Sequence, residues 1–352
     1  MNMKKKILST SAIITTLLLF HDIPTESISA KKEVKVYYAS KNSNQLIAEP
    51  VDRLVKIVYH DNPLSRLFLP VSGYMGKYAT QYAGKVANST NQATVKAKID
   101  HFQTLYKDLL NMHEYSVPED GFNTFNDWFI RSFKDLEKSR PMSNDSLSIV
   151  SPADSKLLII PHLSDNVQMI IKEQHFNVAK FLGDVTLAEQ FKDGVMMIFR
   201  LAPYDYHHYH YPFDCQVGPE HPIKGGYHSV NPRAFTAGVK PLTHNKRSYE
   251  LLKPVNSHQE KPIVMAQVGA TAIASIVNEF MDYKNNKLKQ EKNCIYKKGA
   301  AMGYFQFGGS TVVLLFPKDT ITLDAQIIKN SKNGYETAVK VRETIATWKM
   351  HA

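Results

Sequence analysis

The sequence predicts an α+β protein, in which a helical amino-terminal region precedes a β-rich body with barrel-like or sandwich-like strands. Two observations carry this prediction. Apolar residues recur at helical spacing before residue 118, and short β-type runs separated by turn residues follow residue 145. The 352 residues are 43% hydrophobic and 22% charged, which excludes a disordered chain, a collagen-like repeat and a long coiled coil. We expect three parts, at 1–30, 31–145 and 146–352.

The first thirty residues are typical of an export signal. Three lysines at positions 4–6 precede an apolar run at 7–20, and the small residue Ala30 comes before two further lysines. The apolar run is shorter than the roughly 20 residues that span a bilayer. We therefore expect a signal peptide at 1–30, with an uncleaved membrane anchor as the alternative. The mature protein would be periplasmic, secreted or peripheral on a membrane.

The region 31–145 is expected to be helical. Ile99, Phe102 and Tyr106 recur at three- and four-residue steps and would form one apolar face of a helix. Thr124 and Asp127 have the spacing of a capping box, which predicts the start of a further helix.

The segment 64–82 combines large apolar side chains with two basic residues, Arg66 and Lys77. Such a segment either rests on an anionic membrane surface or packs onto its own domain. The net charge of +10 suits anionic lipid or nucleic acid, but it is equally compatible with a solvated basic face. We expect an anionic membrane surface as a partner and no nucleic acid.

The β-rich body begins after residue 145. Strands are predicted at 157–160, 195–201, 263–268, 271–277 and 311–316, with turn residues at 225–226, 231–232 and 333–334. The chain contains two cysteines, Cys215 and Cys294, which allow either one disulfide after export or two buried free thiols.

The segment 303–316 carries the sharpest chemical signal. Gly308, Gly309 and Ser310 between two strands can simply form a tight hairpin. However, a serine that follows glycine can also attack its own upstream carbonyl, because glycine offers no side-chain obstruction. The resulting ester can eliminate and leave a pyruvoyl group, whose ketone forms a Schiff base with an amine and accepts electrons during decarboxylation.

Three histidines, His207, His208 and His210, occur within four positions of the segment 201–212. On a strand, His208 and His210 would share one face, and His207 would take the other. A zinc site would need a further ligand at recognisable spacing, which the sequence does not supply, so we expect no metal. Base catalysis needs a histidine oriented by a carboxylate, and Asp154 at a turn beside a predicted strand is the candidate.

Taken in order, these segments resemble the phosphatidylserine decarboxylase family over about four-fifths of the chain. The matching segments are 122–131 with 140–141, 151–154, 205–212, 229–232, 245–247, 268–270 and 303–311. The resemblance implies self-cleavage between Gly309 and Ser310, a pyruvoyl cofactor made from Ser310, and continued association of the two resulting chains. It leaves a homodimer open.

The resemblance also implies a role for each site residue. Asp154 would orient His210, which would take the hydroxyl proton of Ser310 during self-cleavage, and His207 would serve the decarboxylation step. The chain departs from the family pattern at several positions outside these four: Ser155, Glu173, His208, Cys215 and Ala301. These departures leave self-processing intact but put the substrate in question.

Three functions follow as hypotheses. The first is a self-processing carboxy-lyase that converts phosphatidylserine to phosphatidylethanolamine and CO₂. The second is a pyruvoyl-dependent decarboxylase of a free amino acid, such as an aromatic one. The third, a catalytically inactive exported binding protein, is disfavoured because Asp154, His210 and Ser310 are all present.

Overall fold

The computed structural model describes residues 36–41, 45–50, 84–163, 167–169, 174–236, 238–255, 259–270, 276–279, 281–282, 287–288, 295–308 and 310–350. The expected signal peptide, the segment 64–82, Cys294 and Gly309 lie outside these residues. Cys215 is buried, but its pairing with Cys294 is therefore untested. Val36–Ala352 forms one compact unit. The expected boundary after residue 145 stays a prediction.

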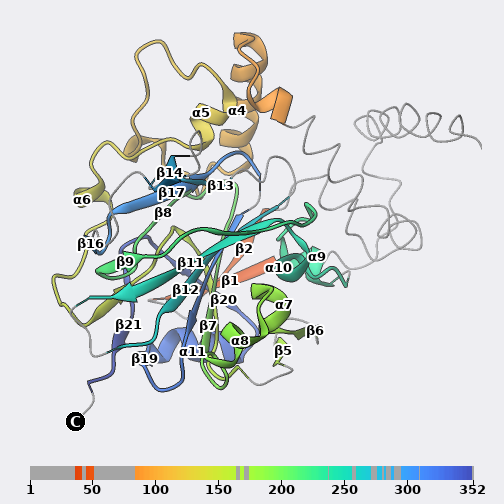
Figure 1. Cartoon of the computed structure of the whole chain (residues 1–352). Coiled ribbons are helices and arrows are strands. Elements are labelled where there is room, and N and C mark those ends of the chain that lie inside the picture. The colour runs from red at the N-terminus through yellow and green to blue at the C-terminus, as the bar shows by residue number, and fades with distance from the viewer. Residues whose placement is uncertain are drawn as a thin grey trace, which may run out of the picture. The chain divides into compact units, whose positions relative to one another are not determined.

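One large sheet runs through this unit (Figure 1). Its described strands follow the order β16-β9-β11-β12-β18-β7-β4-β20-β1-β2, and β10 pairs with β11. All neighbours are antiparallel except β1 and β20, which are parallel. The bounds are β1 Val36–Ser40, β2 Leu46–Glu49, β4 Ser155–Ile160, β7 Val195–Leu201, β9 Cys215–Val217, β10 His221–Ile223, β11 Arg247–Pro254, β12 Ile263–Gly269, β16 Ile295–Tyr296, β18 Ser310–Phe316 and β20 Glu336–Val339.

Smaller sheets and two-stranded ribbons accompany the large sheet. One sheet has the order β13-β17-β8 and another β19-β21-β3, while β14 pairs with β15 and β5 with β6. The bounds are β3 Ser148–Val150, β5 Val167–Met169, β6 Gln174–Phe176, β8 His208–His210, β13 Ile276–Asn278, β14 Met281–Asp282, β15 Lys287–Leu288, β17 Ala301–Phe305, β19 Ile321–Leu323 and β21 Thr344–Trp348.

Both faces of the large sheet are covered, because its strands alternate apolar side chains between two cores. One core joins the sheet to the two three-stranded sheets and to α11 (Ala325–Lys332). The other lies under α7 (Val178–Leu182), α8 (Val185–Glu189) and α10 (Pro241–His244). Among the described strands, the order runs from β16 to β2 without closing. The structure is therefore sandwich-like, as one of the two expected arrangements, and not a barrel.

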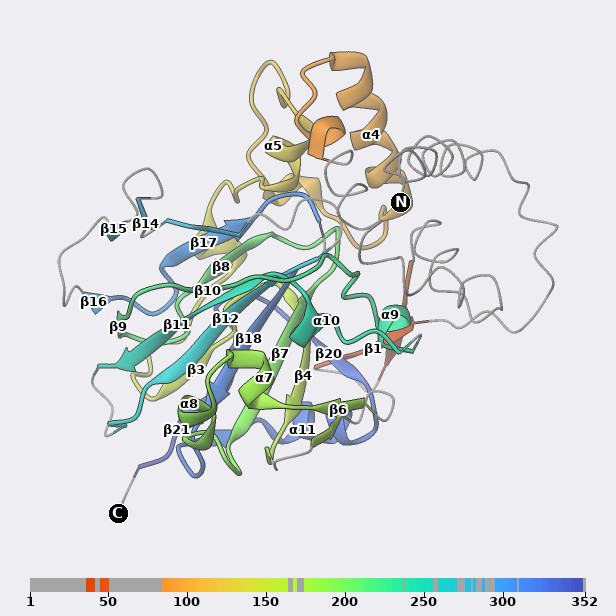
Figure 2. The same cartoon turned by 45° about the vertical axis from the view of Figure 1, so that its right-hand side comes forward.

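The expected helices occur in the described part of the amino-terminal region, above the sheets in Figures 1 and 2. Their bounds, with that of α9 in the body, are α4 Gln92–Leu105, the 3₁₀ helix η3 Met112–Glu114, α5 Phe125–Phe129, α6 Leu136–Ser139 and α9 Pro232–Thr236. Thr124 and Asp127 form the predicted capping box at the start of α5. No described helix is long and apolar enough to cross a membrane.

The region before residue 145 is not wholly helical. β1 and β2 lie at 36–49, where helix was expected, and β1 joins the large sheet beside β20, near the other end of the sequence. In the body, the strands predicted at 157–160, 195–201, 263–268 and 311–316 are confirmed as β4, β7, β12 and β18. Of the run predicted at 271–277, the structure describes β13.

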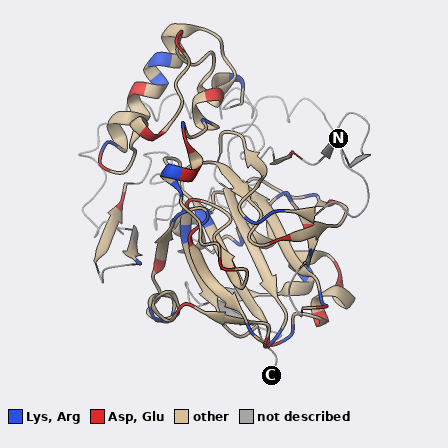
Figure 3. Cartoon of the chain, turned by 90° about the vertical axis from the view of Figure 1, so that its left-hand side faces the viewer, with Lys and Arg blue, Asp and Glu red and all other residues tan. Residues whose placement is uncertain are grey.

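Most strand residues on the face shown in Figure 3 carry no charge. The large sheet nevertheless contains two almost completely buried cations, Lys156 on β4 and Arg200 on the neighbouring strand β7. A buried cation is costly unless it is paired. Their partners, described below, lie close to the candidate site.

Candidate active site

Ser310 is the first residue of β18, in the middle of the large sheet. It pairs with Leu201 at the end of β7 on one side and with Gly269 at the end of β12 on the other. Its side chain is fully buried. The loop that follows β7 contains His207, which lies next to the Ser310 hydroxyl, and His208 and His210 follow this loop in β8.

His207 makes direct contact with Ser310. Its Nδ1 lies 3.1 Å from the Ser310 hydroxyl, and its Nε2 lies 3.1 Å from the carbonyl oxygen of Ala202. A carbonyl can only accept a hydrogen bond, so Nε2 must carry the ring hydrogen and donate it. Nδ1 is then the unprotonated nitrogen, and the hydroxyl of Ser310 donates to it. This is the arrangement that a general base requires.

The surroundings of His207 keep the ring neutral. The ring is fully buried, and Phe129 from α5 stacks on it with 3.8 Å between ring centroids. Burial first, and then the positive charge of Arg131, hold the pKa of His207 well below its usual range. The guanidinium of Arg131 donates to the carbonyls of Trp128 and Tyr204, and so it also ties α5 to the loop that carries His207.

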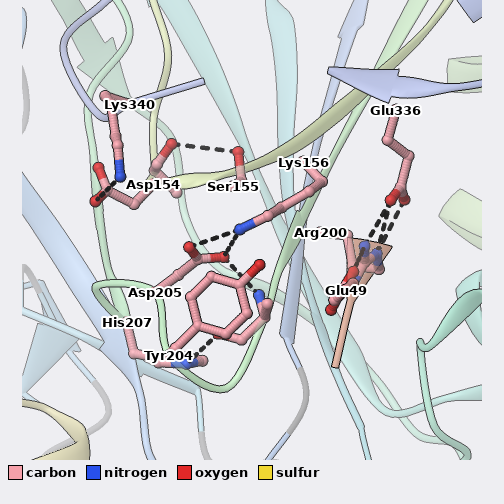
Figure 4. Close-up of polar contacts among 12 residues, drawn as sticks. Glu49, Asp154, Ser155, Lys156, Arg200, Tyr204, Asp205, His207, Glu336 and Lys340 are labelled. Atoms are coloured by element: carbon pink, nitrogen blue, oxygen red, sulfur yellow. Dashed lines mark hydrogen bonds and ion pairs between the residues drawn. The ribbon is translucent and has the colours of Figure 1, made fainter. Parts of the chain in front are cut away.

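A buried ion pair holds the turn that supplies the Ala202 carbonyl (Figure 4). Lys156 Nζ lies 2.8 Å from both carboxylate oxygens of Asp205. Asp205 in turn accepts a hydrogen bond from the backbone N–H of Ala202 at 2.7 Å, and its own N–H donates to the Ala202 carbonyl at 2.9 Å. The carbonyl that fixes the His207 tautomer is therefore itself held in place.

His210 occupies a different environment. Its Nδ1 donates to the carbonyl of Gly299 at 2.9 Å, and its Nε2 accepts from the hydroxyl of Tyr206 at 3.3 Å. Burial lowers the pKa of His210 to about 4. His208 stacks on the same Tyr206 ring, with centroids 4.7 Å apart, and donates to the carbonyl of Ile130. His208 and His210 therefore contact one common ring, as strand spacing predicts.

Asp154 lies immediately before β4 and is almost completely buried. Arg140 donates to both of its oxygens, at 3.0 Å from Nε and 2.7 Å from Nη2, and the backbone N–H of Val341 donates at 2.8 Å. Lys340 Nζ lies 3.6 Å away (Figure 4). Burial alone would raise the pKa of Asp154, but Lys340, Arg140 and the Val341 N–H outweigh it and lower this pKa to about 2.

The structure thus brings together only part of the expected constellation. Ser310 is joined to His207 and not to His210, and the hydrogen bonds of Asp154 within the described chain go to Arg140 and Val341 rather than to His210. Hydrogen bonds therefore do not link Asp154 through His210 to Ser310 in the structure, and the expected roles of these residues in self-cleavage stay a prediction. Asp154 is instead bonded to Arg140 and to the Val341 N–H, and both ring nitrogens of His210 are engaged by the Gly299 carbonyl and the Tyr206 hydroxyl.

Sequence reasoning missed several residues that build the site. Arg140 and Asp205 enter the sequence analysis only within segments that carry the resemblance, and Lys156 and Lys340 enter it nowhere. Asp205 and Lys156 had a usable signal, since charged residues in or beside apolar runs usually need a buried partner. Among the described residues, no three His, Cys, Asp or Glu side chains are grouped to hold a metal ion.

Comparison with known proteins identifies the family of the chain. The family model for phosphatidylserine decarboxylase matches residues 125–347. A phosphatidylserine decarboxylase proenzyme of Fusobacterium nucleatum is 30% identical over 311 residues, which cover 88% of this chain and 96% of the relative. The proenzyme of Clostridium botulinum is 33% identical, covering 77% and 85%, and proenzyme 2 of Clostridium acetobutylicum is 35% identical, covering 73% and 80%. The chain belongs to the phosphatidylserine decarboxylase family.

Proposed function

We propose that this protein is a phosphatidylserine decarboxylase that cleaves its own chain between Gly309 and Ser310 and then converts phosphatidylserine to phosphatidylethanolamine and CO₂. The observation that carries the proposal is the buried contact of 3.1 Å between the Ser310 hydroxyl and Nδ1 of His207. Relatives that are covered over 96% and 85% of their length bear the name phosphatidylserine decarboxylase proenzyme, which supports the same reaction here.

Self-cleavage starts at the Ser310 hydroxyl. His207 Nδ1 takes the hydroxyl proton while the oxygen attacks the carbonyl carbon of Gly309, and the same proton then passes to the Ser310 nitrogen, which leaves as an amine. This exchange turns the peptide bond into an ester. Loss of the α-proton of residue 310 then expels Gly309 as a carboxylate. Water hydrolyses the remaining enamine, releases ammonia and leaves a pyruvoyl group at position 310.

The residues around position 310 fit such a group. The site is buried, which excludes bulk water, and the neutral His207 ring remains beside position 310 to hold or move a proton. A pyruvoyl ketone supplies the electron sink for the loss of CO₂ from an amino acid group. The chain's own contribution is to orient this position through β18 and to keep it out of contact with bulk solvent.

The test of this function is the mass of the purified protein. We expect two fragments, one of them comprising residues 310–352 with a blocked amino terminus, and decarboxylation of phosphatidylserine in vesicles. Ser310→Ala should remain one chain and be inactive, because no oxygen nucleophile is left at position 310. Normal fragmentation of Ser310→Ala would refute self-cleavage at this bond. Activity on free tryptophan without activity on vesicles would refute the lipid substrate.

Export and membrane docking complete the proposal. The basic and apolar pattern at 1–20 supports export, and the apolar, basic segment 64–82 supports docking on an anionic surface. Mature protein taken from outside the cytoplasm should lack residues 1–30, and vesicles containing phosphatidylserine should bind it less strongly as salt increases.

A further inference from the structure

The segment just before Ser310 is held by the helical region. The backbone N–H of Phe307 donates to the Oδ1 atom of Asn126 at 3.0 Å, across 181 residues of sequence. The Phe307 ring also packs edge-on against three other phenylalanine rings, at centroid distances of 6.0, 4.9 and 5.2 Å: Phe102, Phe125 and Phe129. Lys98 Nζ lies 4.5 Å from the centre of the same ring.

Asn126 is well suited to hold this segment rigidly. It lies in α5, is 4% exposed, and its own carbonyl accepts from the backbone N–H of Ile130. The capping box of Thr124 and Asp127 fixes the first turn of the same helix. The neighbouring ring of Phe129 stacks on His207. One short helix therefore touches both the proposed base and the chain upstream of the proposed cleavage point.

The chain downstream of that point is held as well, because Ser310 is paired within β18 on both sides. Between the two anchors lies Gly308, whose φ of 149° is a value that residues with a side chain rarely adopt. Two fixed ends only a few residues apart restrict where the residues between them can lie.

We propose that Asn126 and Phe307 are positioning residues for self-cleavage. They hold the segment just before Ser310 so that the bond between Gly309 and Ser310 is presented to the Ser310 hydroxyl. This inference rests on the proposed function. The physical reason is that an attacking atom must be held within about 3–3.5 Å of its target, and a misplacement of about 1 Å can slow such a step roughly 100-fold.

The test follows the fraction of newly synthesised chain that is cut over time in a cell-free system. Asn126→Leu keeps the branching of asparagine at Cγ, with a larger side chain, but lacks an acceptor, and we expect it to cut about tenfold more slowly than the wild type. Asn126→Asp keeps an oxygen at the same position, so it should cut within about threefold of the wild-type rate. Equal rates for wild type and Asn126→Leu would overturn the inference.

Hydroxylamine separates positioning from a later defect, because it cleaves the ester directly into a Gly309 hydroxamate and a free Ser310. If Asn126 acts on the attack step, the ester forms slowly in Asn126→Leu, and this variant should still be cut slowly when hydroxylamine is added. Restoration of the wild-type rate by hydroxylamine would assign the defect to the elimination and overturn the inference.

A second pair of variants keeps the test valid if Asn126→Leu does not fold. Phe307→Ala removes the ring that packs on the three phenylalanines, and we expect this variant to be cut about tenfold more slowly than the wild type. Phe122→Ala is the matched control, since Phe122 is also a half-buried ring on the same aromatic cluster. Phe122→Ala should cut within about threefold of the wild-type rate. If both variants slowed cutting equally, the effect of Phe307→Ala would be a general loss of stability, and the positioning role of Phe307 would be refuted. A wild-type chain that is never cut would instead refute the proposed function itself.

Discussion

At the scale of single residues, one carbonyl decides which nitrogen of His207 faces Ser310. Ala202 accepts from Nε2, so the lone pair of Nδ1 is left for the hydroxyl. His210 has the same residue type and the same burial, but its Nδ1 donates to Gly299 and its Nε2 accepts from Tyr206. Both of its nitrogens are engaged away from Ser310. Residue type alone therefore does not identify the base.

Replacing each histidine in turn distinguishes them. We expect His207→Ala to slow self-cleavage by about 10² to 10⁴-fold, which is the usual contribution of a positioned general base. His210→Ala should slow it less, because His210 acts on Ser310 only through its neighbours. The measurement is the rate at which the full-length band disappears. Rapid cutting of His207→Ala together with a complete block in His210→Ala would instead identify His210 as the base for self-cleavage, as the resemblance implies.

The histidines also predict how stability changes with pH. Burial lowers the pKa of His210 to about 4, from an ordinary value of about 6.5. Between these values the unfolded chain binds a proton that the folded chain does not, so the free energy of unfolding falls as the pH decreases from 6.5 toward 4. Each pH unit costs at most about 1.4 kcal/mol for this one group. His207 and His208 act in the same direction.

Urea unfolding of the uncut Ser310→Ala chain at pH 7 and pH 5 tests this expectation. His210→Gln in that background removes the titrating ring, so its loss of stability between the two pH values should be smaller by about 2 kcal/mol. Identical losses in the two proteins would show that His210 is not held neutral by the fold.

At the scale of elements, sequence reasoning succeeded where the signal was local. The apolar runs at 157–160, 195–201, 263–268 and 311–316 are long enough to predict buried strands by themselves, and they form the centre of the large sheet. The capping box of α5 is equally local. β1 and β2 are short runs that pair with each other as a local antiparallel hairpin, but the place of β1 in the large sheet depends on its parallel partner β20, near the other end of the sequence.

In the site, too, local signals were predictable from the sequence and long-range contacts were not. Ser310 and Asp154 were identified from short motifs, and the structure places both in buried positions at the ends of strands. The partner of Ser310 was not predictable, because His207 precedes β8 and strand spacing does not fix the direction of its side chain. Asp154 receives the N–H of Val341 from 187 residues away. No spacing rule connects positions that only the fold brings together.

At the scale of the whole unit from Val36 to Ala352, the proposed cut falls inside the large sheet rather than at its edge. The small chain would contribute β18, which lies between β12 and β7, and β20, which lies between β4 and β1. A buried ion pair crosses the same divide. Arg200 of the large chain contacts Glu336 of the small chain at 2.6 Å, and also Glu49 of the large chain at 2.6 Å (Figure 4).

We therefore expect the two chains to remain together after cleavage. Gel filtration in 1 M NaCl should give one peak that contains both fragments, because buried ion pairs and strand hydrogen bonds are screened far less than surface charges. Denaturant should separate the fragments in the same transition that unfolds the sheet, since β18 cannot leave without breaking its own pairing with β7 and with β12. Release of the small chain by salt alone, with the large chain still folded, would contradict the central place of β18.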